Sequence, residues 1–182
     1  ELVRFGCETV SRILELDGAR NLHWLFEPHD NWVKAMACRA LLDDIASFAS
    51  PVIILTGGEP LLRPDLFELA SHGTDRGLRM VLATNGTLVD ERTAEKIRDS
   101  GIRRVSISLD GSDATRHDAL RAVPGAFDGA MGGIDALRTA GVEFQVNTTV
   151  TRRNLSDLDR ILDLAVSLGA AAHHLFLLVP TG

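Results

Sequence analysis

A chain of 182 residues, 45% apolar and 24% charged, has the length and composition of one soluble globular domain. Its net charge of -6 and its scattered basic residues argue against nucleic acid or an anionic membrane as a partner, because both attract a concentrated basic face. No apolar run is long enough to span a membrane, no signal peptide is visible, and only two cysteines occur, so we expect a cytoplasmic protein.

The first part of the chain has little regular pattern. Residues 2–5 could form a strand and residues 8–16 a helix, whereas residues 21–30 look irregular. We treat residues 6–38 as an atypical segment inside a single domain that covers 1–182. An amphipathic helix is expected over 39–48.

From Pro51 onward, short apolar runs alternate with helical patterns. The composition of these runs predicts strands buried on both faces, at 51–56, 79–84, 103–109, 142–150 and 173–179. The 3.6-residue period predicts helices at 65–76, 90–100, 125–140 and 155–168. Several helices are expected to end at a glycine in the left-handed conformation, which would close the last helical turn. These glycines are Gly77, Gly101, Gly141 and Gly169.

Strands that alternate with helices at this spacing predict right-handed crossovers and a parallel sheet. With residues 2–5 counted, about six strand–helix units are expected, too few for a closed eight-stranded barrel. An open barrel or a doubly wound sheet remains. In either fold, the ligand binds at the carboxyl ends of the strands.

The strongest local motif is Gly57-Gly58-Glu59-Pro60, directly after the first apolar run. The two glycines allow the backbone to turn and to approach a ligand closely. The carboxylate that follows, next to a rigid proline, can accept hydrogen bonds from a ligand ammonium group.

This motif resembles the one by which radical S-adenosylmethionine (SAM) enzymes bind the amino group of SAM. The other matching landmarks are Thr84-Asn85-Gly86, Ser106-Ile107-Ser108-Leu109-Asp110-Gly111, His117, Arg121, Gly125-Ala126-Phe127 and Asn147-Thr148-Thr149-Val150. The resemblance covers about residues 39–182 and is nearest to the haem-biosynthesis and peptide-modifying branch. It implies an α/β fold, a partial (β/α)6-type open barrel with parallel strands.

The resemblance also implies roles for individual residues. Gly57, Gly58 and Glu59 would hold the SAM amine. Arg121 could pair with the SAM carboxylate, for which a guanidinium group is suited. The remaining residues implied in cofactor binding are Pro60, Thr84, Asn85, Ser108, Asp110, Asn147 and Leu177.

Plainer readings compete for several of these residues. Ser108 and Asn147 could simply form hydrogen bonds at strand ends, and Asp110-Gly111 is by itself a turn signal. His117 is expected to cap or orient a helix rather than to act as a base. One of His173 and His174 must face outward from its strand.

The family reaction is the reductive cleavage of SAM to a 5′-deoxyadenosyl radical by a [4Fe–4S] cluster, which needs an electron donor and acts on a small-molecule or peptide substrate. In the family, a Cys-x3-Cys-x2-Cys triplet holds the cluster, and here it would fall within 6–38. The sequence has only Cys7 and Cys38, 31 positions apart. These two are candidate metal ligands, with His23 and His29 nearby, but buried inert thiols are the alternative.

Three explanations of the missing triplet stay open: a degenerate relative, a replaced loop over 6–38, or a fragment of a chain that continues beyond Gly182. The functional alternatives are a radical SAM enzyme core and a non-catalytic SAM-binding or partner subunit on the same scaffold. A barrel enzyme that binds phosphate is disfavoured, because Glu59 and Asp110 place negative charge at the strand ends.

Overall fold

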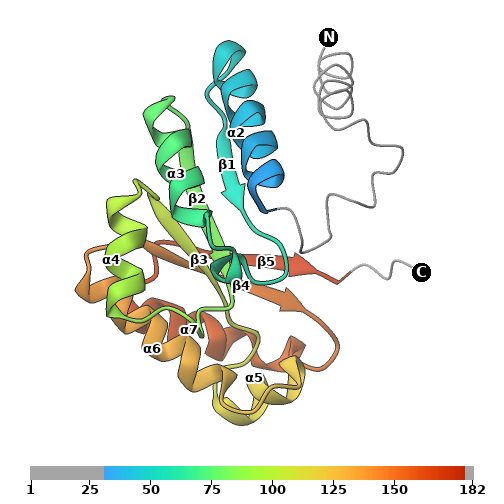
Figure 1. The fold of residues 1–182 in the computed structure, drawn as a ribbon. Coiled ribbons are helices and arrows are strands. Elements are labelled where there is room, and N and C mark those ends of the chain that lie inside the picture. The colour runs from blue at the N-terminus through green and yellow to red at the C-terminus, as the bar shows by residue number, and fades with distance from the viewer. Residues whose placement is uncertain (1–30, 179–182) are drawn as a thin grey trace.

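The computed structural model of the chain describes residues 31–178, which form a curled sheet with helices along its outer side (Figure 1). The five described strands are all parallel and lie in sequence order, each paired with the next. They are β1 (Val52–Leu55), β2 (Arg79–Thr84), β3 (Arg104–Ser108), β4 (Phe144–Val150) and β5 (His173–Leu177). The predicted partial barrel is confirmed. The strand expected at 2–5 and the helix expected at 8–16 lie outside the described residues.

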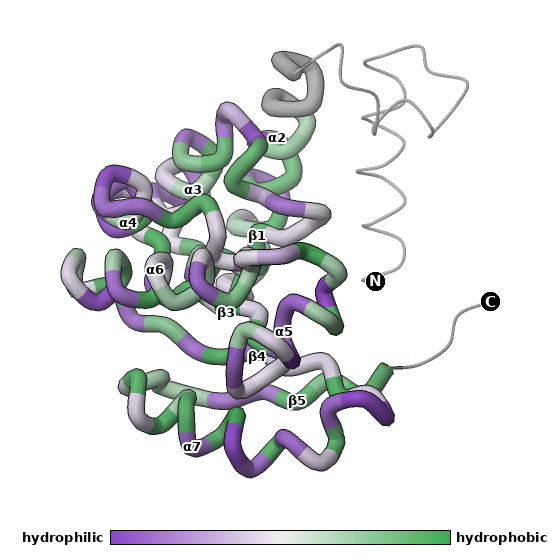
Figure 2. Tube along the Cα trace, turned by 90° about the horizontal axis from the view of Figure 1, so that it is seen from below, coloured by the Kyte–Doolittle hydropathy of each residue, from purple (hydrophilic) through white to green (hydrophobic). Residues whose placement is uncertain are grey.

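Helices connect successive strands, as parallel pairing requires. They are α2 (Asn31–Phe48), α3 (Leu66–Asp75), α4 (Glu91–Asp99), α5 (Ala114–Arg121), α6 (Ala126–Thr139) and α7 (Leu158–Leu168), with short 3-10 turns η2 (Pro60–Leu62) and η3 (Leu155–Asp157). Figure 2 shows hydrophobic and hydrophilic residues alternating along these helices. None of the helices within 31–178 has both the length and the apolar character that crossing a membrane requires.

Helix ends follow the sequence signals closely. The four predicted glycines all adopt left-handed φ angles, between 71° and 82°. At the other end of α4, the Asp90 carboxylate accepts a hydrogen bond from the Thr93 amide at 2.7 Å. Asp113 caps α5 in the same way, at 2.9 Å from the Arg116 amide. The sequence patterns had not indicated α5, because its eight residues carry little apolar periodicity.

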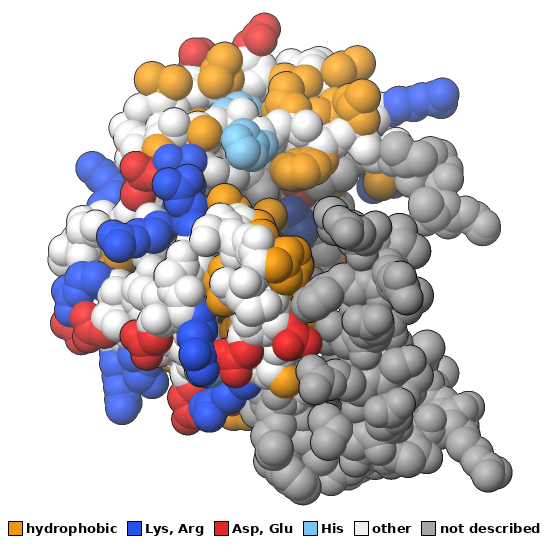
Figure 3. Space-filling model, turned by 90° about the horizontal axis from the view of Figure 1, so that it is seen from above, with side chains coloured by type: hydrophobic (Ala, Val, Ile, Leu, Met, Phe, Trp, Pro, Cys, Tyr) orange, Lys and Arg blue, Asp and Glu red, His pale blue; other side chains and the backbone are white. Residues whose placement is uncertain are grey.

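The two faces of the sheet differ. On the helix-covered face the alternate strand residues are fully buried, and they include Met80, Leu82, Val105, Ile107 and Val146. The sequence predicted strands that are buried on both faces. For β1 and β5 this prediction is wrong, because on the concave face Ile54 is 59% and Phe176 is 52% exposed. The reason is that no described element packs on the concave side. Figure 3 shows hydrophobic side chains left at the surface.

Candidate functional site

The carboxyl ends of the parallel strands meet at one edge of the sheet, and Glu59 lies there, just beyond β1. Its backbone begins the turn η2, whose first residue is the buried Pro60. The Glu59 carboxylate accepts hydrogen bonds from the Thr84 hydroxyl at 2.6 Å and from the Asn85 amide at 2.9 Å. A third hydrogen bond comes from the Leu61 amide at 3.2 Å. The Glu59 side chain is therefore held against the tip of the neighbouring strand β2.

The tip of β2 is itself a fixed element. Thr84 is buried, and its hydroxyl oxygen also accepts a hydrogen bond from the Gly86 amide at 3.1 Å. The Asn85 carboxamide oxygen accepts hydrogen bonds from the amide and hydroxyl of Thr87, both at 2.8 Å. Thr84 and Asn85 thus act on Glu59 through contacts that the structure shows, and any contact of theirs with a ligand is a prediction.

Two strands further along the sheet, Asp110 follows β3 and is almost fully buried. Its carboxylate forms an ion pair with the Arg121 Nε at 2.6 Å and accepts the Thr149 amide at 2.7 Å. Arg121 comes from the last turn of α5 and remains 35% exposed. A turn alone would not need a buried carboxylate in this position. Asp110 thus orients Arg121 at the same edge of the sheet as Glu59.

His117 connects α5 with the end of β3. Its Nδ1 accepts a hydrogen bond from the Asp110 amide at 3.0 Å, so the neutral ring carries its proton on Nε2. Burial lowers the pKa of His117 from its usual 6.5, and the nearby Arg121 cation lowers this pKa further. His117 is neutral and orients the helix, in agreement with the interpretation of the sequence.

The other predicted residues lie at the same edge or just inside it. Ser108 and Asn147 are direct neighbours in the pairing of β3 with β4. Leu177, at the tip of β5, is 77% exposed and lines a cavity of about 960 Å³ together with Asp110 and Arg121. Gly57 and Gly58 have open space where a side chain would be. The structure therefore places two groups at this edge: one around Glu59, and one around Asp110 and Arg121.

Two buried polar residues in the loop after β4 were not recognised from the sequence. The Asn154 carboxamide donates to the carbonyl oxygens of Asp110 and Thr149, at 3.1 Å and 2.9 Å. The Asp157 carboxylate accepts the amide and the hydroxyl of Ser112, both at 2.8 Å. The sequence feature that could have identified them is their place in the loop that directly follows a predicted parallel strand. They fix the loop after β3 and hence the Asp110–Arg121 pair.

Of the candidate metal ligands, Cys38 lies within the described residues. Cys7, His23 and His29 lie outside the described residues. Cys38 is half-buried in α2, and its Sγ lies 3.9 Å from a terminal nitrogen of Arg63. Within residues 31–178, no cluster of His, Cys, Asp or Glu side chains could hold a metal ion. With two cysteines in the sequence, this chain does not supply the three thiolates of the family cluster.

Comparison with known proteins gives consistent results. Residues 23–165 match the model of the Radical SAM superfamily. The chain is 53% identical over 141 residues to an AdoMet-dependent heme synthase of Methanosarcina barkeri, covering 78% of this chain and 40% of that protein. It is 43% identical over 126 residues to an Fe-coproporphyrin III synthase of the same organism, covering 69% of this chain and 31% of the relative.

Among solved structures, Streptococcus suis SuiB bound to S-adenosylmethionine has a TM-score of 0.64 at 19% identity, with 83% of this chain and 34% of SuiB covered. This likeness concerns the fold. The chain spans less than half the length of the relatives it matches. The matched family model covers most of the chain and agrees with the half-barrel and with the motif at the end of β1, so the chain belongs to the radical SAM superfamily.

Proposed function

We propose that the carboxyl edge of this sheet binds SAM and that the chain is the core of a radical SAM enzyme of haem biosynthesis. The observation that carries the proposal is the Glu59 carboxylate, which three donors hold at the tips of β1 and β2. A carboxylate has about four acceptor positions, so about one remains for the ammonium group of SAM. The relatives named for heme and Fe-coproporphyrin III synthesis support the reaction class.

The opposite end of the amino-acid part of SAM would be bound by Arg121. Asp110 pairs with its Nε, and among the described residues no hydrogen bond is donated by its two terminal nitrogens. These nitrogens can donate to a carboxylate, and a guanidinium already oriented by Asp110 loses less entropy on binding. Glu59 would thus bind the ammonium group and Arg121 the carboxylate group of the amino-acid part of SAM.

The nucleoside part of SAM would lie across the tips of β3, β4 and β5. Ser108 and Asn147 offer polar groups for the ribose, and the exposed Leu177 offers apolar contact to the adenine. In this arrangement the residues of this chain bind and orient SAM. SAM supplies the sulfonium centre that the family cleaves.

The iron–sulfur cluster of the family does not fit the residues of this chain. Cys38 is the one described thiol, it contacts Arg63, and the whole sequence holds one other cysteine. We therefore assign no reductive step to these residues. This observation is the basis of a second candidate function, a SAM-binding or partner subunit without radical chemistry.

Calorimetric titration with SAM tests the binding site. Glu59→Gln removes the negative charge and should weaken SAM binding about tenfold or more, because hydrogen bonds to charged groups are among the stronger ones. Glu95→Gln, an exposed carboxylate on α4, is the matched control and should bind as the unmodified protein does. Equal affinities of the two variants would refute the assignment of Glu59.

Iron and sulfide analysis after anaerobic reconstitution separates the two candidate functions. Binding of SAM without stoichiometric iron would support the subunit without radical chemistry. A full complement of cluster iron would show that ligands beyond those described complete the site, and it would support the first candidate function, a radical SAM enzyme.

A further inference from the structure

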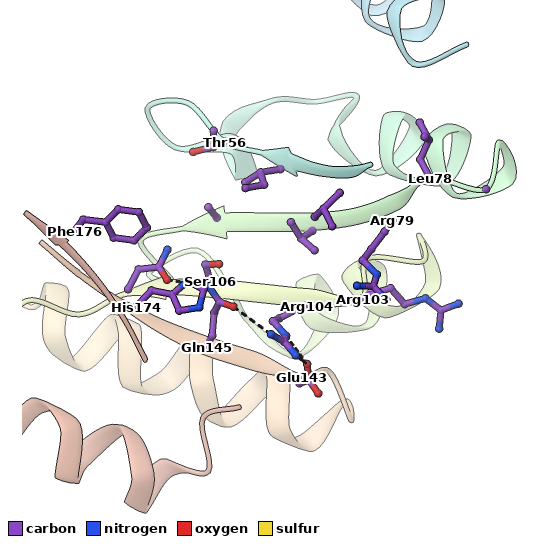
Figure 4. Close-up of a pocket in the computed structure, with 16 residues that line it drawn as sticks. Thr56, Leu78, Arg79, Arg103, Arg104, Ser106, Glu143, Gln145, His174 and Phe176 are labelled. Atoms are coloured by element: carbon purple, nitrogen blue, oxygen red, sulfur yellow. Dashed lines mark hydrogen bonds and ion pairs between the residues drawn. The ribbon is translucent and has the colours of Figure 1, made fainter. Parts of the chain in front are cut away.

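Polar side chains on the strands and in the loops that follow them lie in two different settings. Ser106, Gln145 and His174 line the open cavity on the concave side of the sheet, as Figure 4 shows. Asn154, in the loop after β4, lies instead in the interior and is 3% exposed. Because a buried amide is costly when its donors and acceptors are unpaired, the partners of Asn154 show what this side chain does.

The Asn154 carboxamide uses all of its hydrogen-bonding positions. Its Nδ2 donates to the Thr149 carbonyl oxygen at 2.9 Å and to the Asp110 carbonyl oxygen at 3.1 Å. Its Oδ1 accepts from the Thr151 amide at 2.7 Å and from the Thr151 hydroxyl at 3.2 Å. An asparagine has two donor and two acceptor positions, so none remains for a ligand. Asn154 can therefore act on a ligand only through the residues that it holds.

The contacts of Asn154 close a ring of hydrogen bonds among three residues. Asn154 joins the carbonyl oxygens of Asp110 and Thr149, and the Thr149 amide donates back to Oδ1 of the Asp110 carboxylate at 2.7 Å. The second carboxylate oxygen, Oδ2, lies 2.6 Å from the Arg121 Nε. The ring thus holds the backbone and the side chain of Asp110 together, and it determines where Oδ2 meets the guanidinium.

We propose that Asn154 is a positioning residue for the carboxylate of SAM, which acts through Asp110 to hold Arg121 in the orientation that binds this carboxylate. The inference rests on the proposed function, because it takes Arg121 as the partner of the SAM carboxylate. A guanidinium that is already held in one orientation loses less entropy when it binds. Without Asn154, the ligand itself would have to order the Asp110–Arg121 pair.

The other buried carboxylate of this loop has a different partner. Asp157 accepts the amide and the hydroxyl of Ser112, which lies two positions after Asp110. Among residues 31–178, the Asn154 side chain alone donates hydrogen bonds to both Asp110 and Thr149. Its loss should therefore affect the Asp110 carboxylate more directly than the loss of Asp157 would.

The loss should also be confined to one end of SAM. Glu59, the proposed partner of the ammonium group, is held by Thr84 and Asn85 at the tip of β2 and has no contact with the ring of Asn154. Removing the ring should thus weaken recognition of the carboxylate and leave recognition of the ammonium group intact. A general loss of stability would not separate the two groups in this way.

The test compares SAM with decarboxylated SAM, which keeps the nucleoside, the sulfonium and the ammonium group but lacks the carboxylate. In calorimetric titrations, the unmodified chain should bind SAM about tenfold more tightly, and Arg121→Ala should abolish this preference. Asn154→Asp keeps the shape and the acceptor for Thr151 but removes the donors. It should reduce the preference about threefold or more and leave the affinity for decarboxylated SAM unchanged.

Two further variants separate positioning from folding. Asn154→Ala also removes the donors but brings no charge into the interior, so it serves as the test where Asn154→Asp does not fold. Ile97→Val, in the buried face of α4, is the matched control for stability. It should lower the melting temperature and leave the preference for SAM unchanged. In the unmodified protein, the side-chain amide protons of Asn154 should exchange with water more slowly than those of an exposed asparagine.

The outcomes distinguish the inference from the proposed function. An unchanged preference in both Asn154 variants, while Arg121→Ala abolishes it, would overturn the inference and leave the SAM site in place. An equal loss of affinity for the two ligands would show that Asn154 maintains the whole site, which also overturns it, as would fast exchange of the Asn154 amide protons. Failure of the unmodified chain to bind SAM would refute the proposed function, and the inference with it.

Discussion

Two adjacent glycines in α6 allow the packing behind the candidate site to be tested directly. A side chain at Gly133 would place its Cβ 2.4 Å from the carbonyl oxygen of Gly86, whereas a side chain at Gly132 would meet nothing within 4 Å. Gly86 follows Asn85, whose amide donates to Glu59. The helix and the loop after β2 therefore touch at a point with no room for a methyl group.

The magnitude follows from that distance. Real Cβ contacts essentially never fall below 3.0 Å, so α6 or the loop must move by about 0.6 Å in a packed core. Such overpacking costs about 1–3 kcal/mol, and replacing a helical glycine returns about 0.5–1 kcal/mol. We expect Gly133→Ala to lower the free energy of unfolding by about 1–2 kcal/mol and Gly132→Ala to raise it by about 0.5–1 kcal/mol.

Urea unfolding followed by circular dichroism measures both variants, with thermal melts as a second readout. At this chain length, each kcal/mol corresponds to about 2–4 °C in melting temperature. Gly133→Ala should also weaken SAM binding, since it displaces the loop that fixes Glu59. If Gly133→Ala were as stable as Gly132→Ala, the close approach of α6 to the Gly86 carbonyl would not exist in solution.

Three further predictions concern charged and titratable groups. Asp110→Asn keeps the shape but removes the charge facing Arg121, and it should cost about 1–3 kcal/mol in urea unfolding, less than for a fully buried pair because Arg121 is partly exposed; an unchanged midpoint would contradict this. Burial lowers the pKa of His117, so its contribution to the free energy of unfolding is fully present above pH 6.5 and is lost as the pH falls below that value. An NMR titration of His117 with a midpoint above 6.5 would contradict this, because stability would then fall with rising pH. Hydrogen bonds from backbone amides at the start of α6, that of Phe127 foremost, lower the pKa of Asp118 from 3.8. Its contribution is therefore lost as pH falls below 3.8, and Asp118→Asn should show a shallower acid dependence of the urea midpoint.

The sequence predicted those features that depend on local chemistry. Glycine closes helices because its backbone adopts the left-handed conformation without strain, and each of the four predicted positions does so. The motif after β1 and the Thr84-Asn85 pair after β2 were recognised as separate strand-end signals. Their hydrogen bonds to each other could not be read from the sequence, because the pairing of the strands brings them together.

The features that the sequence did not predict are tertiary. Apolar runs indicated strands buried on both faces, but a run cannot show whether an element covers each face, and Ile54 and Phe176 face the open concave side. Asn154 and Asp157 resemble ordinary loop residues in sequence. Their importance comes from distant partners, the Asp110 carbonyl and Ser112, which lie more than forty residues away along the chain.

The two parts of the family chemistry depend on different parts of this chain. Glu59 is held by Thr84 and Asn85, and Arg121 by Asp110, so both proposed contacts to SAM are positioned by the sheet. Neither contact requires a metal for its geometry. A chain that lost its cluster thiolates would therefore keep its SAM site as long as β1, β2 and β3 remain paired. If the proposed SAM site holds, SAM binds this chain without iron, and measuring SAM affinity and iron content on one preparation distinguishes the two proposed functions.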